Sequence, residues 1–213
     1  NNTDERIFGL FRTTNGYITN LSLVDVNINI LALDNGSYTY YIGGITGQNH
    51  GIITNSYVVG KIQVDNVPYI YVGGIAGYSG NGQYEEVYTK GELIINGRYN
   101  NYIGGIYGYG YRGNINNTYS EMKITSSSNE YSYIGGLVGH DYDRMKINNS
   151  YYYGSISHEG NSYYGGIVGY TNNGEVVNSF SNTMYLMGEI NNSTVINSYL
   201  LGMENEGYRY SYR

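Results

Sequence analysis

Short stretches of alternating apolar and polar residues run along most of the chain, separated by glycine and asparagine. Residues 57–64 show the pattern, with Val58, Ile62 and Val64 on one side of the expected strand and a glycine at position 60. A period of two is typical of a β-strand with one buried face, and a glycine inside it indicates a bend. A helical period is not sustained in any segment, and the frequent glycines oppose one. The sequence therefore predicts many short strands joined by turns.

One pattern, a tyrosine two residues before a Gly-Gly pair, occurs five times. The first glycines of these pairs are separated by 30, 31, 31 and 30 residues, and they are Gly43, Gly73, Gly104, Gly135 and Gly165. A second pattern, Asn followed by Ser or Thr and an aromatic residue, recurs at residues 54–57, 116–119, 148–151, 177–180 and 195–199. The second repeat departs from this pattern and has Glu85-Glu86 there. A fixed period of this length is the signature of a stacked repeat.

These periods predict one domain over residues 1–213, an all-β, right-handed parallel β-helix (β-solenoid) of six to seven coils. We place the coils near residues 7–35, 36–66, 67–98, 99–129, 130–160 and 161–190, with a partial coil over 191–213. Inward ladders are expected at Ile45, Ile75, Ile106, Leu137 and Ile167, and at Ile53, Ile115, Ile147 and Val176. The Gly-Gly pair should mark a tight corner. A β-propeller or sandwich is the alternative, but a propeller blade needs about 40 residues.

The repeated pattern resembles the GLUG repeat, named for Gly-Leu-hydrophobic-Gly. Gly136-Leu137-Val138-Gly139 followed by Asn149-Ser150-Tyr151 is the best copy, and the resemblance covers residues 7–202. It implies a stalk or binding module of a large secreted or surface protein, mostly bacterial, such as an adhesin-like protein or an immunoglobulin A peptidase. The repeat itself brings no catalytic residue.

The composition excludes several classes of partner and of site. The chain has 213 residues, a net charge of −6, no cysteine and no basic patch, so nucleic acid is not expected as a partner. Disulfides and thiolate metal sites are excluded. No apolar run reaches 18 residues, so no membrane insertion is expected. Because the chain begins at Asn1 without Met, we expect a processed chain or a segment of a longer one.

Tyrosine is the main candidate binding residue, with 30 copies in the chain. Two sets recur in register: Tyr41, Tyr71, Tyr102, Tyr133 and Tyr163, and Tyr78, Tyr109 and Tyr170. The simplest interpretation is a stacked structural ladder. The alternative is an exposed platform for a glycan or a protein, because tyrosine offers an apolar ring and a hydroxyl. Further tyrosines, such as Tyr107, Tyr109, Tyr111, Tyr152 and Tyr153, exceed the needs of a core and favour a contact surface.

Two acidic groups are weaker candidates. Asp141 and Asp143 are spaced like calcium ligands, but the rest of a calcium loop is missing, and a solvated turn with an Asp–Arg pair is the simpler interpretation. Glu85, Glu86 and Glu92 lack aligned basic partners for a polysaccharide-cleaving site. Catalytic residues, cofactors and metals are therefore not expected. Asn-x-Ser/Thr sequons also occur, at Asn20, Asn35, Asn116, Asn148 and Asn192.

These observations favour a non-enzymatic, extracellular or cell-surface scaffold or adhesion module. A glycan, a surface protein of a host or neighbouring cell, or a second copy is the expected partner. Two alternatives stay open: a self-assembling subunit of a filament or surface layer, and a carbohydrate-active enzyme of the β-helix type.

Overall fold

The computed structural model describes residues 5–33 and 36–201, and every regular element in them is a β-strand. Every recorded strand pairing is parallel, which confirms the predicted solenoid and excludes antiparallel blades. Neighbouring coils of the central part are 30 or 31 residues apart, as in the pairing of Tyr41 with Tyr71 and of Tyr71 with Tyr102. The part of the chain that is described has no helix that could span a membrane.

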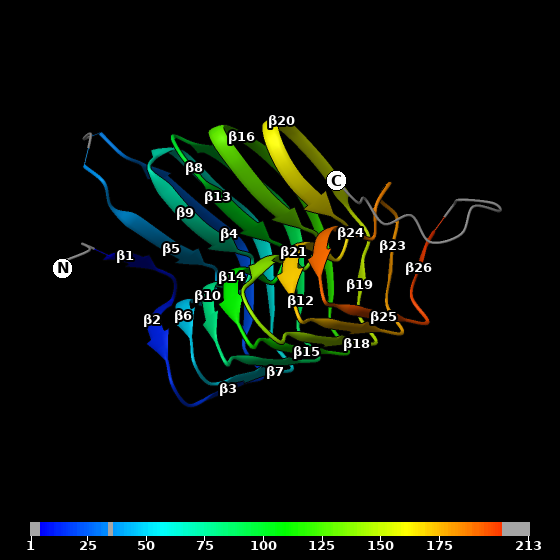
Figure 1. Cartoon of the computed structure of the whole chain (residues 1–213). Helices are drawn as coiled ribbons and strands as arrows, with labels where there is room; N and C mark the ends of the chain where they lie inside the picture. The colour runs from blue at the N-terminus through cyan, green and yellow to red at the C-terminus, as the bar shows by residue number, and fades with distance from the viewer. Residues whose placement is uncertain (1–4, 34–35, 202–213) are drawn as a thin grey trace.

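Two seven-stranded sheets form two sides of each coil (Figure 1). The first contains β2 (Phe11–Thr14), β6 (Thr46–Asn49), β10 (Ala76–Gly80), β14 (Tyr107–Tyr111), β17 (Val138–Asp141), β21 (Val168–Asn172) and β24 (Met187–Asn191). The second contains β3 (Tyr17–Thr19), β7 (Ile52–Thr54), β11 (Gln83–Glu85), β15 (Asn114–Asn116), β18 (Lys146–Asn148), β22 (Glu175–Val177) and β25 (Thr194–Ile196).

The third sheet has twelve strands and folds back on itself. One layer holds β1 (Glu5–Phe8), β5 (Thr39–Gly43), β9 (Tyr69–Gly73) and β13 (Asn101–Gly104), and the other holds β4 (Ser22–Leu31), β8 (Tyr57–Val67) and β12 (Tyr88–Gly97). The long β16 (Tyr119–Gly135) links the two layers and pairs with β20 (Ser155–Gly165). Three short strands complete it: β19 (Tyr151–Tyr152), β23 (Phe180–Ser181) and β26 (Tyr199–Leu200).

The interior is divided into two apolar clusters. The larger one, which we call the body core, lies inside the three sides and contains both predicted ladders, fully buried: Ile45, Ile75, Ile106, Leu137, Ile167, Ile53, Ile115, Ile147 and Val176. The smaller one, the arm core, lies between the two layers of the twelve-stranded sheet and includes Ile42, Val72, Leu93 and Ile124. All coils except the last described one therefore have a triangular body and a flat, two-layered arm.

The Gly-Gly pair lies where the arm joins the body, and it forms the predicted tight corner. A Cβ atom added at Gly44 would lie 2.6 Å from the carbonyl oxygen of Gly74 and 2.7 Å from Cγ1 of Val58 across the core. A Cβ at Gly74 would lie 2.7 Å from Cγ2 of Thr89 in the same way. The backbone thus comes close to the opposite layer in each coil, and only glycine leaves enough room. We call this constriction the waist.

The last described coil is shorter because it has no arm. Val176 pairs with Val195, only 19 residues further along the chain, and Val168 pairs with Met187. Between β23 and β24 the chain crosses directly along the body, and Leu186 continues the ladder of Ile167. The missing Gly-Gly pair in this coil follows from the missing arm, since no corner is needed.

Two of the surplus tyrosines, Tyr107 and Tyr152, correct the expectation that these rings form a surface. Tyr107 and Tyr152 are fully buried in the body core, and Tyr84 is 1% exposed there. Tyr84 fills the ladder position of Ile53 and Ile115, and its ring stacks on that of Tyr107 with centroids 5.5 Å apart. Glycines leave room for two of these rings, because a Cβ at Gly110 or Gly113 would meet Tyr107 and one at Gly136 or Gly154 would meet Tyr152. Part of the tyrosine content therefore serves packing.

Candidate functional site: a tyrosine-lined corner

The five tyrosines before the Gly-Gly pairs form one continuous column. They pair in register along the strands that enter the corner, and their ring centroids are 5.0, 4.8, 4.9 and 5.3 Å apart in the order Tyr41, Tyr71, Tyr102, Tyr133 and Tyr163. The planes of Tyr102 and Tyr133 differ by only 2°. We call this set the first column.

The second column stands on the strands that leave the corner. Its members pair in the order Gln48, Tyr78, Tyr109, His140, Tyr170 and Glu189. Rings of the two columns contact each other across the corner, and in several pairs the ring planes are nearly perpendicular. Tyr102 meets Tyr109 at 5.2 Å and 80°, and Tyr133 meets Tyr170 at 5.9 Å and 88°. Both predicted sets of tyrosines therefore lie on one face, and we call this surface the tyrosine corner.

The tyrosines of the corner are half-buried, chiefly against one another. Burial raises the pKa of Tyr41 to about 12, and it raises the pKa of Tyr71 and Tyr102 further. The hydroxyl groups of neighbouring tyrosines also raise these pKa values, and the carboxylate of Glu5 raises that of Tyr41. The hydroxyls therefore stay protonated at neutral pH and can donate hydrogen bonds.

His140 interrupts the second column. Its ring lies among four tyrosines, with centroid distances of 5.7, 5.0, 5.2 and 4.6 Å to Tyr102, Tyr109, Tyr133 and Tyr170. Burial lowers the pKa of His140 to about 4, so the imidazole is neutral at pH 7. Neither ring nitrogen has a hydrogen-bond partner among the described residues. A neutral imidazole without partners can both donate and accept a hydrogen bond.

A second aromatic ladder lies on β8, β12 and their equivalents, outside the candidate sites predicted from the sequence. The rings of Tyr57, Tyr88, Tyr119, Tyr151, Phe180 and Tyr199 stack with centroids 4.5 to 5.6 Å apart. The signal was present in the aromatic residue that ends each Asn-Ser/Thr pattern. We call this set the outer ladder, and it offers a natural control for the tyrosine corner.

The Asn-Ser/Thr pattern that precedes the outer ladder has a structural role. The asparagines adopt a positive φ, for example 49° at Asn117, and their side chains form hydrogen bonds from coil to coil. The hydroxyls of Ser56, Ser150, Ser179 and Ser198 each accept a backbone N–H from the preceding coil, as Ser150 Oγ does from Thr118 at 3.1 Å. The hydroxyls of the sequons at Asn116 and Asn148 are buried in this ladder, whereas Asn20 and Asn192 are exposed. Asn35 lies outside the described residues.

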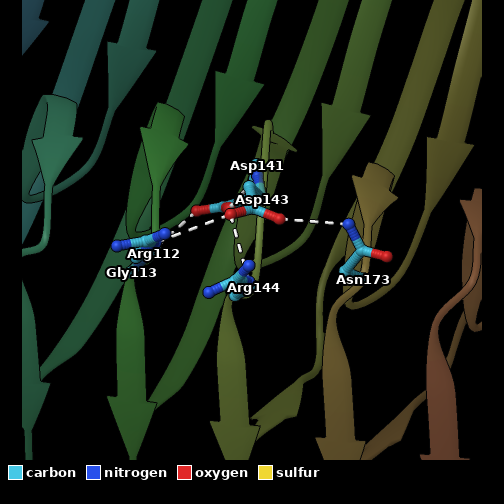
Figure 2. A network of polar contacts seen from close by, with 6 residues as sticks. All are labelled: Arg112, Gly113, Asp141, Asp143, Arg144 and Asn173. Carbon is cyan, nitrogen blue, oxygen red and sulfur yellow. Dashed lines mark hydrogen bonds and ion pairs between the residues drawn. The ribbon is translucent and has the colours of Figure 1, made fainter.

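Asp141 is buried and is the last residue of β17 (Figure 2). Its carboxylate accepts hydrogen bonds from Tyr107 Oη at 2.9 Å and from the backbone N–H groups of Gly113 and Asp143. Burial raises the pKa of Asp141 to about 6, although these hydrogen bonds act in the opposite direction.

Asp143 faces different partners from those of Asp141. It lies 3.5 Å from Arg112 Nε and 3.4 Å from Arg144 Nε, and it accepts a hydrogen bond from Asn173 (Figure 2). Within residues 5–33 and 36–201, no group of three or more His, Asp or Glu side chains is arranged to hold a metal ion. The two carboxylates thus act as a turn anchor and as an ion-pair partner.

The other acidic candidates also contact structural neighbours. Glu85 accepts hydrogen bonds from Asn116 at 2.7 Å and from Asn117 at 2.8 Å, which continues the asparagine ladder through the irregular coil. Glu86 has a φ of 52°, so it makes the same bend as the asparagines. Glu92 is paired in register with Lys61 and Lys123 on its two neighbouring strands.

Comparison with known families identifies the repeat. Residues 38–63 match the family model Glug, described as the GLUG motif. The matched segment runs through β5, the Gly43-Gly44 corner, β6 and β7 into β8, which is one coil of the solenoid. The chain therefore carries a GLUG repeat in a β-solenoid. Searches of curated proteins and of solved structures found no match.

Proposed function

We propose that this chain is a non-enzymatic repeat module of the cell surface or extracellular space, and that it binds a glycan or a surface protein through the tyrosine corner. The observation that carries the proposal is the convergence of the two tyrosine columns on one face. Eight half-buried tyrosines in five adjacent coils form a rigid surface of rings and hydroxyls. Such residues give contact area at a low cost in side-chain entropy.

The regularity of the solenoid supports a scaffold more than an enzyme. The buried Asp141 and the paired Asp143 and Glu85 have structural partners, so these carboxylates have no free role in acid–base chemistry. A uniform stack of coils instead offers an extended lateral surface, which is how repeat proteins commonly bind.

A glycan array and a cell-binding assay test the proposal. We compare the wild type with two triple variants, Tyr71→Ala/Tyr102→Ala/Tyr133→Ala and Tyr78→Ala/Tyr109→Ala/Tyr170→Ala. The matched control is Tyr57→Ala/Tyr88→Ala/Tyr119→Ala, which removes three stacked tyrosines of the outer ladder. Binding should be lost in the corner variants and kept in the control. If folded corner variants bind everything that the wild type binds, the tyrosines are structural only and the proposal is wrong.

A further inference from the structure

The spacing of the tyrosine corner restricts the ligand to a polymer of a particular repeat length. Rings of the first column recur every 4.8 to 5.3 Å along the solenoid. An extended peptide advances by only about 3.3 Å per residue, and a nucleic-acid strand by about 3.4 Å per nucleotide. A pyranose linked through opposite ring carbons advances by one ring and one bridging oxygen, which is close to the strand separation of about 4.8 Å.

The ring faces in the middle of the corner are already occupied. Tyr102 and Tyr133 stack on each other with parallel planes, and Tyr102 also meets Tyr109 edge-on. A cation would need a free ring face within about 6 Å of the centroid. The surface that remains is therefore made of ring edges and hydroxyls, which suit the hydroxyl groups of a sugar better than a cationic group.

Carboxylates border both ends of the corner. Glu5 contacts the hydroxyl of Tyr41 and accepts a long hydrogen bond from Gln48, and Glu189 pairs with Tyr170 on the next strand. The whole chain also has a net charge of −6. This negative field disfavours a polyanion such as a uronic-acid polymer and is compatible with an uncharged one.

His140 adds an unused hydrogen-bonding group in the middle of the corner. Both of its ring nitrogens lack a partner in the described part of the chain, although its ring packs against four tyrosines. A buried polar atom without a partner is unfavourable. Both nitrogens are buried, so His140 does not present them to a ligand at the surface of the corner.

We infer that the tyrosine corner binds a neutral, linear polysaccharide whose sugars are joined by equatorial bonds, lying parallel to the solenoid axis with one sugar per coil. This inference rests on the proposed function and specifies its ligand. Equatorial linkages at opposite ring carbons keep the polymer straight, so successive sugars stay in register with successive coils. A polymer with axial linkages coils away from the row of tyrosines.

The first test measures how affinity depends on ligand length and linkage. Isothermal titration calorimetry of the whole chain uses cello- and chito-oligosaccharides from the disaccharide to the hexasaccharide, with malto-oligosaccharides and oligogalacturonates for comparison. We expect affinity to rise with each sugar up to the pentasaccharide, because five coils carry the first column. The comparison sugars should bind at least tenfold more weakly. An equal affinity for malto-oligosaccharides, or no gain beyond the disaccharide, would overturn the inference.

The second test removes hydroxyls while keeping the rings. Tyr102→Phe/Tyr133→Phe should weaken binding of the pentasaccharide about tenfold, as expected for one to two lost hydrogen bonds. The control Tyr88→Phe/Tyr119→Phe, in the outer ladder, should leave affinity unchanged. Equal affinity in the corner variant and the control would contradict the assigned surface.

The two levels of the proposal fail in different ways. If the array and the cell assay find a tyrosine-dependent protein or branched glycan while linear oligosaccharides do not bind, the module function stands and the ligand class is wrong. If no partner of any kind depends on the corner, both are wrong.

Discussion

At the scale of the residue, the turns explain why asparagine recurs so regularly. Seven equivalent positions have a positive φ between 43° and 58°: Asn20, Asn55, Glu86, Asn117, Asn149, Asn178 and Asn197. Glycine adopts this conformation most easily, and among residues with a side chain asparagine is one of those that tolerate it best. Its amide also joins the ladder of the neighbouring coils. Glu86 is the exception, and the structure holds it in a conformation that glutamate disfavours.

Replacing Glu86 by Asn should therefore stabilise the protein. We expect Glu86→Asn to raise the free energy of unfolding by about 0.5–1 kcal/mol, because asparagine relieves the cost of the positive φ. Thermal and urea unfolding of the variant and the wild type measure the difference. The opposite exchange, Asn117→Glu, is the matched control and should lower stability. A loss of stability in Glu86→Asn would show that Glu86 makes a compensating contact.

Two buried ionisable residues should give opposite pH dependences. The pKa of His140 is lowered to about 4 from a usual 6.5, so the folded state binds fewer protons than the unfolded state between these values, and stability falls on acidification. The pKa of Asp141 is raised to about 6 from 3.8, so stability rises as the pH falls through that range. Each effect is at most about 3 kcal/mol, and together they largely cancel.

Variants should separate the two effects. In Asp141→Asn, stability should fall from pH 6.5 to pH 4, with a smaller effect of the same sign from His158, whose pKa is also lowered by burial. In His140→Phe, stability should rise over the acidic part of this range. Urea unfolding at several pH values measures both slopes. Parallel slopes in the two variants would show that one of the groups does not titrate as its burial indicates.

At the scale of the element, the sequence predicted most of the architecture. The 30–31-residue period and the alternation in each strand determined the parallel coils and the residues of the body core. The division into body and arm was not predicted, because an arm layer and a body side have the same alternation. The buried positions of Tyr84 and Tyr107 also could not be predicted, since they depend on contacts across the coil, where the two rings stack on each other. The two tyrosine columns contact each other because of the angle between the strands at the corner. A periodic sequence pattern gives no information about this angle.

The waist gives a test of this architecture. Gly44→Ala places a methyl group 2.6 Å from the carbonyl oxygen of Gly74, and this backbone atom cannot move away cheaply because Gly74 is hydrogen-bonded to the coils on both sides. We expect a loss of about 1–3 kcal/mol or more, as in other overpacked cores. Gly16→Ala is the control, since a Cβ there meets no atom within 4 Å. Equal unfolding midpoints in urea for the two variants would contradict the close approach at the waist.

At the scale of the whole molecule, the waist divides the interior into two cores that share few side chains; Ile156 is a partly buried residue that packs against both. The body core is enclosed by three sheets and continues into the last described coil, where the arm is missing. The arm core is held between two layers only. Local opening should therefore be cheaper in the arm than in the body.

Native-state hydrogen exchange should detect this difference. Backbone amides of Ile62, Leu93 and Ile124 in the arm should exchange faster and at lower urea concentration than those of Ile53, Ile115 and Ile147 in the body. The free energies of opening should form two groups. A single common value would mean that the arm and the body unfold as one cooperative unit.

The tyrosine columns also give the protein an unusual optical property. The chain contains 30 tyrosines and no tryptophan, so its intrinsic ultraviolet emission comes from tyrosine alone. Rings about 5 Å apart in two ladders are close enough to pass excitation from one to the next before they emit. Emission polarisation should accordingly be low even though the rings are fixed, and a quencher that reaches one ring should dim its whole column. Binding of a partner along the corner should therefore change the tyrosine emission, and this change can be measured without an added label.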